Sequence, residues 1–191
     1  MTPGRDGVVV RAEEAADVER VHELVAAAFD PEPVAELLAA LRRSSAWRDL
    51  SFVADSDGRV VGHVSFTRGW LDTRSRLVEV LVLSPLSVDP PAQGRGVGST
   101  LVRRALELLQ DRPEPLVFLE GSPAFYSRLG FRAGAPAGFS APSSRIPPAA
   151  FQFVALPSYD PSMTGALVYP DAFWEHDAVG LREAAVSDRP T

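Results

Sequence analysis

The near-continuous apolar run Leu77–Val88 is the feature that most constrains how this 191-residue chain can fold. A strand with apolar residues at almost every position is buried on both faces, so other elements must cover both of its sides. Pro85 interrupts the run, and because proline cannot donate to a sheet ladder, it predicts a bulge or a place where strand pairing fails. Pro90 and Pro91 close the strand. We therefore expect the central strand of a mixed α/β domain.

The segments around this run alternate between helical and extended patterns. Apolar side chains recur at helical spacing after residue 13 and again from Pro33, and Asp30-Pro31 ends the first of these helices. Asp57-Gly58 between two apolar runs predicts a tight hairpin turn. Residues 133–148 are rich in glycine, proline, alanine and serine, which predicts a long loop. Further helices are expected at 98–110 and 123–129, and further strands at 8–10, 51–54, 60–67, 115–119, 151–156 and 166–169.

Length and composition narrow the class of protein. A chain of this length forms one domain with a well-buried core, expected at about residues 7–174 of 1–191, with a mobile tail at 180–191. The net charge of -6, without a basic stripe, argues against nucleic-acid binding. The absence of cysteine excludes disulfides and cysteine chemistry, and the three histidines have no metal-binding spacing. No segment is apolar enough to cross a membrane, so we expect a cytoplasmic protein. The histidine and cysteine patterns lead us to expect no metal site.

The stretch from Gln93 to Ser99 carries the strongest functional signal. It joins the end of the buried strand to an amphipathic helix, and glycines stand at 94, 96 and 98. Glycines let a main chain approach a ligand closely, and a helix start offers free N–H groups and the positive end of a dipole. This combination predicts a turn that binds phosphate or pyrophosphate.

The spacing of the glycines distinguishes between known phosphate-binding turns. The Gly-x-Gly-x-x-Gly spacing of dinucleotide-binding folds fails at Ser99 and at Leu101, and the Gly-Lys-Ser/Thr of a P-loop is absent. The pattern Gln93-x-x-Gly96-x-Gly98, preceded by Leu-Ser-Val-Asp-Pro, resembles the signature of the GNAT (GCN5-related) N-acetyltransferase family. Tyr126-Ser-Arg-Leu-Gly-Phe131 resembles a second element of that family. Segments 83–88 and 165–173 resemble a bacterial subgroup with unassigned substrates.

The resemblance implies a fold, a reaction and a set of site residues. The fold would be the GNAT fold, with a mostly antiparallel sheet flanked by helices and split by a bulge in the central strand. The reaction would transfer an acetyl group from acetyl-CoA directly to a primary amine, with Tyr126 protonating the leaving thiolate. The Val88 N–H would polarise the thioester carbonyl. The implied cofactor-binding residues are Leu86, Ser87, Val88, Gln93, Gly94, Arg95, Gly96, Val97, Gly98 and Ser99.

Two departures from the family pattern leave alternatives open. Leu119 stands where many relatives have an asparagine, and no general base is evident among Glu79, Asp30, Glu32 or a water chain. A non-catalytic acyl-CoA-binding sensor is therefore an alternative, as is an enzyme that uses a longer acyl-CoA. The acceptor amine belongs to a small molecule or a protein, and exposed strand edges near the C-terminus are compatible with a homodimer.

Overall fold

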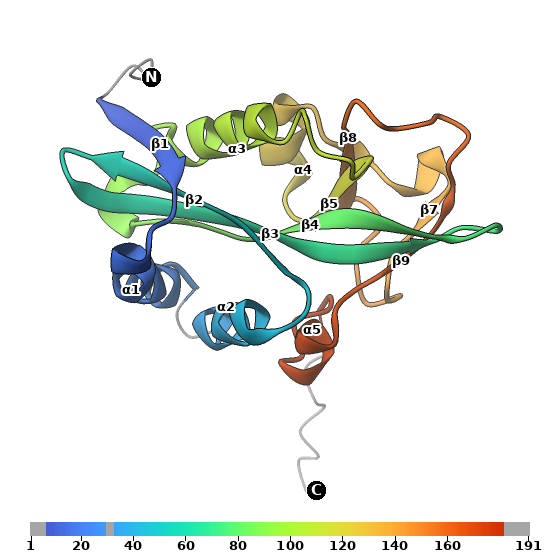
Figure 1. The fold of residues 1–191 in the computed structure, drawn as a ribbon, viewed down its shortest axis with the longest axis horizontal. Coiled ribbons are helices and arrows are strands. Elements are labelled where there is room, and N and C mark those ends of the chain that lie inside the picture. Colours follow the sequence, from blue (N-terminus) through green and yellow to red (C-terminus); the bar gives the residue numbers. More distant parts are fainter. Residues whose placement is uncertain (1–6, 30–32, 182–191) are drawn as a thin grey trace, which may run out of the picture.

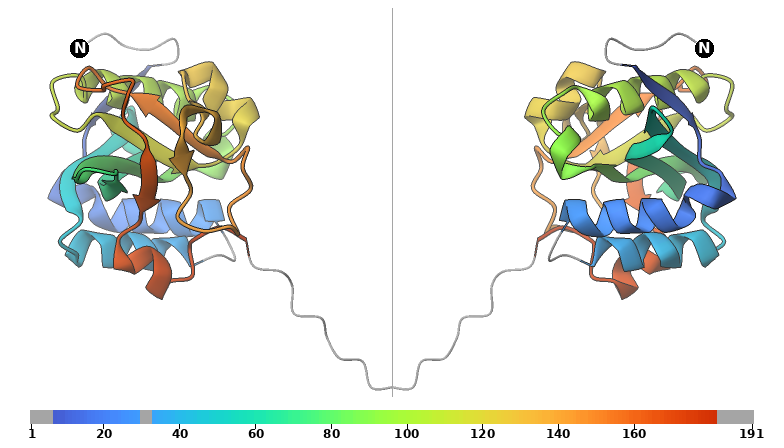
Figure 2. Two further views of the ribbon diagram at one scale, coloured as in Figure 1. Left: turned by 90° about the vertical axis from the view of Figure 1, so that its right-hand side faces the viewer. Right: turned by 90° about the vertical axis from the view of Figure 1, so that its left-hand side faces the viewer.

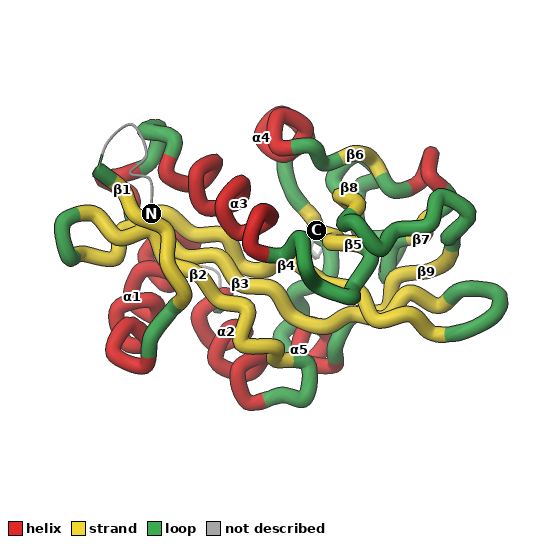
Figure 3. The backbone as a smooth tube through the Cα atoms, turned by 45° about the horizontal axis from the view of Figure 1, so that its top comes forward, coloured by secondary structure: helices red, strands yellow, loops and turns green. Residues whose placement is uncertain are grey.

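A single mixed sheet organises the structure, a computed structural model that describes residues 7–29 and 33–181. Within these residues nine strands pair in the order β1-β2-β3-β4-β5-β8-β6, while β9 pairs with β3 and β7. All pairs are antiparallel except β4 with β5 and β7 with β9. Figure 3 shows the course of the backbone through these strands. The strands are β1 (Val8–Ala12), β2 (Trp47–Ser56), β3 (Arg59–Asp72), β4 (Leu77–Val88), β5 (Leu116–Glu120), β6 (Arg132–Ala133), β7 (Phe139–Ser140), β8 (Phe151–Ala155) and β9 (Gly165–Val168).

Helices cover both faces of the sheet, as Figure 1 shows. α3 (Val97–Leu108) and the short α4 (Pro123–Tyr126) lie on one face. The opposite face carries α1 (Val18–Phe29), α2 (Val34–Arg43) and α5 (Asp171–Glu175), and the side views in Figure 2 show this two-sided arrangement. Short 3₁₀ turns stand at Ala15–Asp17, Pro90–Ala92, Ser127–Leu129 and Ala135–Ala137. This architecture confirms the predicted fold class.

β4 is buried from both sides, as its apolar run predicts. Leu81 and Leu83 pack in the cluster beneath α3, whereas Val80 and Val82 belong to the cluster on the opposite face. These four side chains are at most 4% exposed. Neighbouring residues of a strand point to opposite faces, so an apolar residue at every position serves both hydrophobic layers.

The bulge predicted at Pro85 is present and coincides with a split in the sheet. Phe66 of β3 faces Leu83, but Val64 faces Leu86, so Ser84 and Pro85 together oppose one residue. β5 pairs with β4 only at Leu81–Val117 and Val82–Phe118. Beyond the bulge, the two strands therefore separate.

The sequence predictions differ from the structure mainly at boundaries and in the last third. The Asp57-Gly58 hairpin is confirmed, with both residues in the left-handed region. β2 and β3 are longer than predicted, because apolar patterning weakens at strand ends. The predicted loop 133–148 holds the two short strands β6 and β7, and α5 was not predicted. Asp30-Pro31 and tail residues 182–191 lie outside the described residues. No described helix is long and apolar enough to span a membrane.

Candidate active site

The glycine-rich turn enters α3 through two residues in the left-handed region. Gly94 has φ 75° and Gly96, the N-cap residue of α3, has φ 85°. A side chain is strained in this conformation even though open space surrounds both glycines. Residues 93–96 are exposed. The turn therefore needs glycine for its backbone shape, and it presents that backbone to solvent.

The main-chain N–H groups of this turn are free to bind a ligand. Within the described part of the chain, no acceptor takes a hydrogen bond from the N–H of any residue from Gly94 to Ser99. The first bond of the helix runs from the Thr100 N–H to the Gly96 carbonyl, at 3.0 Å. Unpaired N–H groups at the positive end of a 12-residue helix form a cradle for an anion.

The edge of β4 beyond the bulge also presents unpaired backbone. The Asp89 N–H donates to the Val61 carbonyl at 2.9 Å, which makes these two residues a hydrogen-bonded pair of the ladder. Because such pairs alternate, the main-chain groups of Ser87 point toward β3, whereas the N–H groups of Leu86 and Val88 point toward the split. The Val88 carbonyl accepts from Gln93 Nε2 at 3.1 Å.

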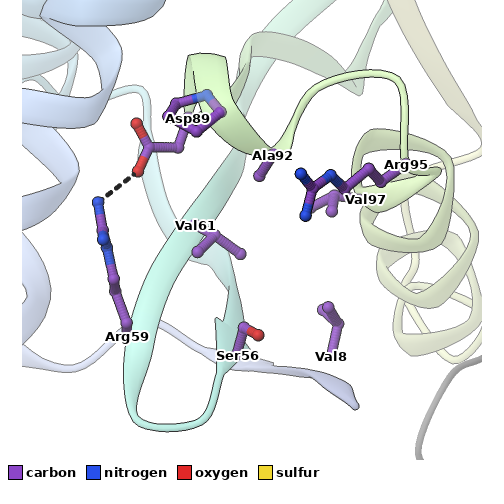
Figure 4. Close-up of a pocket in the computed structure, with 9 residues that line it drawn as sticks. Val8, Ser56, Arg59, Val61, Asp89, Ala92, Arg95 and Val97 are labelled. Atoms are coloured by element: carbon purple, nitrogen blue, oxygen red, sulfur yellow. Dashed lines mark hydrogen bonds and ion pairs between the residues drawn. The ribbon is translucent and has the colours of Figure 1, made fainter. Parts of the chain in front are cut away.

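Asp89 holds the chain where it leaves β4. Its Oδ2 lies 2.6 Å from Arg20 Nη2 of α1 and 2.9 Å from Arg59 Nη2 of the hairpin. Figure 4 shows the Arg59 pair beside a hollow of about 220 Å³, into which Arg95 extends from the turn. The ion pairs join α1, the hairpin and the end of β4, so they fix where the turn begins.

A larger cavity of about 690 Å³ opens at the split between β4 and β5. It is walled by the ends of α1 and α2, by the bulge of β4, by the end of β5 and by the C-terminal segment. The lining includes Ser84, Pro85 and Leu86 on one side and Glu120, Gly121 and Tyr126 on the other. Its size is that of a small-molecule site.

Tyr126 is held rigidly at this cavity by aromatic packing. Its ring makes edge contacts with Phe125 and Phe131, at centroid distances of 4.8 and 5.4 Å. Burial raises the pKa of its hydroxyl, which therefore stays protonated at neutral pH. No hydrogen-bond partner of that hydroxyl occurs among the described residues, so its proton is available to a ligand.

Glu120, which sequence reasoning missed, supplies a carboxylate at the same cavity, as does Asp177. Its Oε2 accepts from the Gly180 N–H at 3.1 Å, and the Tyr169 hydroxyl also bonds to it. Burial raises the pKa of Glu120, although these hydrogen bonds and the charge of Arg145 oppose the shift. The sequence signal that could have identified Glu120 is its position at the end of the apolar segment 116–120, beside the expected split.

None of the candidate general bases named from the sequence is found among the described residues that line the cavity. Glu79 pairs with Arg48, at 2.7 Å, and does not line the cavity, while Asp30 and Glu32 lie outside the described residues. Leu119, at the position of the family asparagine, is buried in the α3-side core. Gln152, which sequence reasoning also missed, is buried opposite it and donates to the Gly121 carbonyl at 3.0 Å. The described residues contain no cluster of three or more metal-ligating side chains.

Comparisons with known proteins agree with this geometry. The chain is 34% identical over 128 residues to the uncharacterized N-acetyltransferase YjhQ of Escherichia coli (strain K12), covering 66% of this chain and 71% of that protein. A GNAT family N-acetyltransferase of Escherichia coli, solved in complex with CoA, has a TM-score of 0.79 and 28% identity, covering 91% of this chain and 95% of the other.

A second solved structure and a family profile complete the comparison. A GNAT family acetyltransferase of Brucella melitensis, solved with acetyl-CoA, has a TM-score of 0.69 and 28% identity, covering 88% of this chain and 99% of the other. The profile described as acetyltransferase (GNAT) domain matches residues 9–134, about two thirds of the chain. This chain therefore belongs to the GNAT family of acetyltransferases.

Proposed function

We propose that this protein transfers an acetyl group from acetyl-CoA to a primary amine at the split between β4 and β5. The observation that carries the proposal is the row of N–H groups from Gly94 to Ser99 that have no partner among the described residues. They follow the strand whose bulge lines a cavity with a half-buried carboxylate and a buried phenol. The Escherichia coli and Brucella melitensis proteins that share this fold were solved with CoA and acetyl-CoA.

The turn would bind the diphosphate of CoA. Six consecutive N–H groups and the positive end of α3 supply donors and favourable potential without any basic side chain. The Gln93 side chain holds the Val88 carbonyl and thereby braces the turn against β4. Arg95 contributes its N–H to the turn, while its side chain extends into the smaller hollow (Figure 4).

The pantetheine arm would lie along the open edge of β4. The N–H groups of Leu86 and Val88 face the split and would pair with the arm as an added strand does, while Ser87 between them keeps its amide within the sheet. This places the acetyl group near the cavity, where the Val88 N–H would polarise its carbonyl.

Tyr126 would supply the proton that the departing thiolate needs. When the amine nitrogen bonds to the acetyl carbon, the carbon–sulfur bond breaks and its electron pair stays on sulfur. The Tyr126 hydroxyl is protonated and has no hydrogen-bond partner among the described residues, and Tyr126 lines the same cavity as the bulge of β4. A positioned donor of this kind contributes about 10²-fold or more to the rate.

The test compares two glycines that share a backbone conformation but differ in place. Gly96 in the turn and Gly58 in the hairpin have φ values of 85° and 82°, and both have open space where a Cβ would stand. Alanine at either position costs about 1–2 kcal/mol of conformational strain. We expect Gly96→Ala to weaken acetyl-CoA binding by about tenfold or more in calorimetry, and Gly58→Ala to leave it unchanged.

Thiol release in the presence of primary amines completes the test. Release that requires an amine establishes transfer. Acetyl-CoA binding without any amine-dependent release would support the acyl-CoA sensor instead. Equal effects of the two alanine variants on acetyl-CoA affinity would show that the turn is not the diphosphate site.

A further inference from the structure

The cavity at the split has acidic but no basic charges on its described walls. Glu120 and Asp177 line it together with His176, and neither arginine nor lysine is among the described lining residues. An acceptor that carried its own carboxylate would find no cation to pair with there. The cavity therefore suits a ligand that is positively charged and not negatively charged.

Glu120 is the carboxylate left to meet such a cation. Asp177 is already paired, because its Oδ1 lies 3.1 Å from Arg145 Nη1. Glu120 accepts two hydrogen bonds, from the Gly180 N–H and from the Tyr169 hydroxyl, and forms no ion pair within 4.0 Å with any described residue. A carboxylate can accept about four hydrogen bonds, so capacity remains for an ammonium group.

The C-terminal segment fixes the orientation of Glu120. The Leu181 N–H bonds to the Arg145 carbonyl at 3.2 Å, which brings Gly180 close over Arg145. A Cβ at Gly180 would lie 2.5 Å from the Arg145 carbonyl carbon, so only glycine fits this crossing. The Tyr169 ring stacks on Phe173 at 4.6 Å, which holds its hydroxyl in place. The carboxylate is thus fixed before any ligand arrives.

The remaining walls of the cavity are mainly apolar and partly aromatic. Phe29 and Leu37 come from α1 and α2, and Tyr169 and Phe173 come from the C-terminal elements. Such walls favour an amine on an aliphatic or aromatic carrier. The volume of about 690 Å³ must also hold the acetyl end of acetyl-CoA, which leaves room for a small acceptor.

We propose that Glu120 binds the ammonium group of the acceptor and takes its proton, and that the acceptor is a small primary amine on an apolar or aromatic carrier without a carboxylate. This inference rests on the proposed function and adds to it both the substrate class and the base. Gly121, on whose backbone the Tyr126 ring packs, directly follows Glu120, so base and acid stand at one end of β5.

The proposed step balances in atoms and charge. Glu120 takes one proton from the ammonium group, and the freed lone pair forms the nitrogen–carbon bond while the carbon–sulfur bond breaks. The thiolate takes the Tyr126 proton, and the phenolate regains a proton from the nitrogen, which becomes a neutral amide. The proton on Glu120 leaves to solvent. Burial raises the pKa of Glu120 and so favours its role as a base.

The substrate test uses three acceptors with acetyl-CoA: 2-phenylethylamine, phenylalanine, and a lysine-containing peptide with a blocked N-terminus. Phenylalanine differs from 2-phenylethylamine only by a carboxylate on the carbon that bears the amino group. We expect kcat/KM for 2-phenylethylamine to exceed that for the other two by about tenfold or more. The chain contains no lysine, so acetylation of its own lysine side chains cannot release thiol in this assay.

The residue test compares Glu120→Gln with Glu79→Gln, the same substitution at a carboxylate of β4 outside the cavity. Glutamine keeps an acceptor for the Gly180 N–H. We expect Glu120→Gln to lower kcat/KM by about 10²-fold or more, with acetyl-CoA affinity and melting temperature unchanged, and Glu79→Gln to change it by less than about twofold.

A pH profile separates proton transfer from simple positioning. The groups near Glu120 that could contribute are Tyr169, Arg145, His176, Asp177 and Tyr126. The fall of kcat/KM at acidic pH in the wild type should be absent from the residual activity of Glu120→Gln. A profile of unchanged shape in this variant would overturn the role as base.

The other outcomes discriminate between the inference and the function on which it rests. A wild type that fails to bind acetyl-CoA defeats the proposed function. Binding with transfer only to the peptide or to phenylalanine leaves the function intact and overturns the substrate class, as does transfer to none of the three. Glu120→Gln within about threefold of the wild type overturns the assignment of Glu120.

Discussion

The ring of Tyr126 rests on the backbone of Gly121, so closely that a Cβ on Gly121 would lie 2.4 Å from ring Cε2 and 2.8 Å from Cδ2. The Gly121 carbonyl is held by Gln152, and its N–H donates to the Ala150 carbonyl at 3.0 Å. The floor under the ring therefore cannot move easily, and any added atom must displace the phenol instead.

Gly121→Ala is therefore expected to impair turnover more than cofactor binding. The methyl group would push the Tyr126 ring away, at a cost of about 1–3 kcal/mol in the free energy of unfolding. We expect kcat to fall by about tenfold or more, because small displacements of a catalytic group are costly. Chemical denaturation, steady-state kinetics and acetyl-CoA calorimetry would measure the three effects. An unchanged kcat would show that the ring position is unimportant.

Tyr126→Phe should separate the role of the hydroxyl from that of the ring. The hydroxyl has no hydrogen-bond partner among the described residues, so its removal should leave the melting temperature nearly unchanged. We expect kcat/KM to fall by about 10²-fold. Tyr159→Phe, outside the cavity, is the matched control. Full activity of the Tyr126 variant would reduce this residue to a packing role.

Ser87→Ala tests whether only the main chain of β4 meets the cofactor. Ser87 pairs in register with His63, and its Oγ is buried without a partner among the described residues. Loss of a buried unpaired hydroxyl is nearly neutral or slightly stabilising. We expect acetyl-CoA affinity to be unchanged in calorimetry and the melting temperature not to fall. A weaker affinity would mean that this side chain, and not only the backbone around it, takes part in binding.

The sequence predicted the parts of this molecule whose cause is local. Three local patterns predicted their own structure, and all three are confirmed: the strand Leu77–Val88, the bulge at the proline within it, and the Asp57-Gly58 turn. The turn at 93–99 could be identified for the same reason, because glycine spacing encodes a backbone shape. Its ligand remains a prediction.

The rest of the site depends on contacts between distant segments. Glu120 becomes a candidate only because Gly180, some 60 residues later, donates to it, and Gln152 supports Gly121 across the β5–β8 pair. No local pattern reports such contacts. Conversely, the place of Glu79 on the central strand made it a candidate base, but its carboxylate forms an ion pair with Arg48. The short strands β6 and β7 were missed because they form only by pairing with β8 and β9.

A second polar cluster lies away from the cavity and includes the buried His63. Glu13, before α1, accepts from Ser51 Oγ and pairs with Arg42 of α2, and Ser51 Oγ lies 2.8 Å from His63 Nε2. If Ser51 donates to Glu13, it accepts from the Nε2–H of a neutral His63. His63 Nδ1 is then a buried atom with no described partner, and protonating it would bury an unpaired charged donor.

The pKa values in this cluster make stability depend on pH in one direction. Burial lowers the pKa of His63 below its ordinary 6.5, although Glu13 opposes the shift. Burial disfavours the ionised Glu13, but the His63 ring 3.5 Å away, the hydrogen bond from Ser51 and the charge of Arg42 prevail and lower its pKa below 4.5. Both groups bind protons more readily in the unfolded chain, so each contributes stability that is present above its unfolded pKa and is lost as pH falls.

We therefore expect the free energy of unfolding to decrease from pH 7 toward pH 5, with His63 contributing at most about 1.4 kcal/mol per pH unit below 6.5. His63→Gln can keep a donor to Ser51 but cannot titrate, so its stability should fall less steeply over that range. His22→Gln, on the exposed side of α1, is the matched substitution outside the cluster. Urea denaturation at several pH values measures the slopes. A slope in His63→Gln as steep as in the wild type would mean that folding does not shift the pKa of His63, and a steeper slope would mean that Glu13 outweighs burial and raises that pKa.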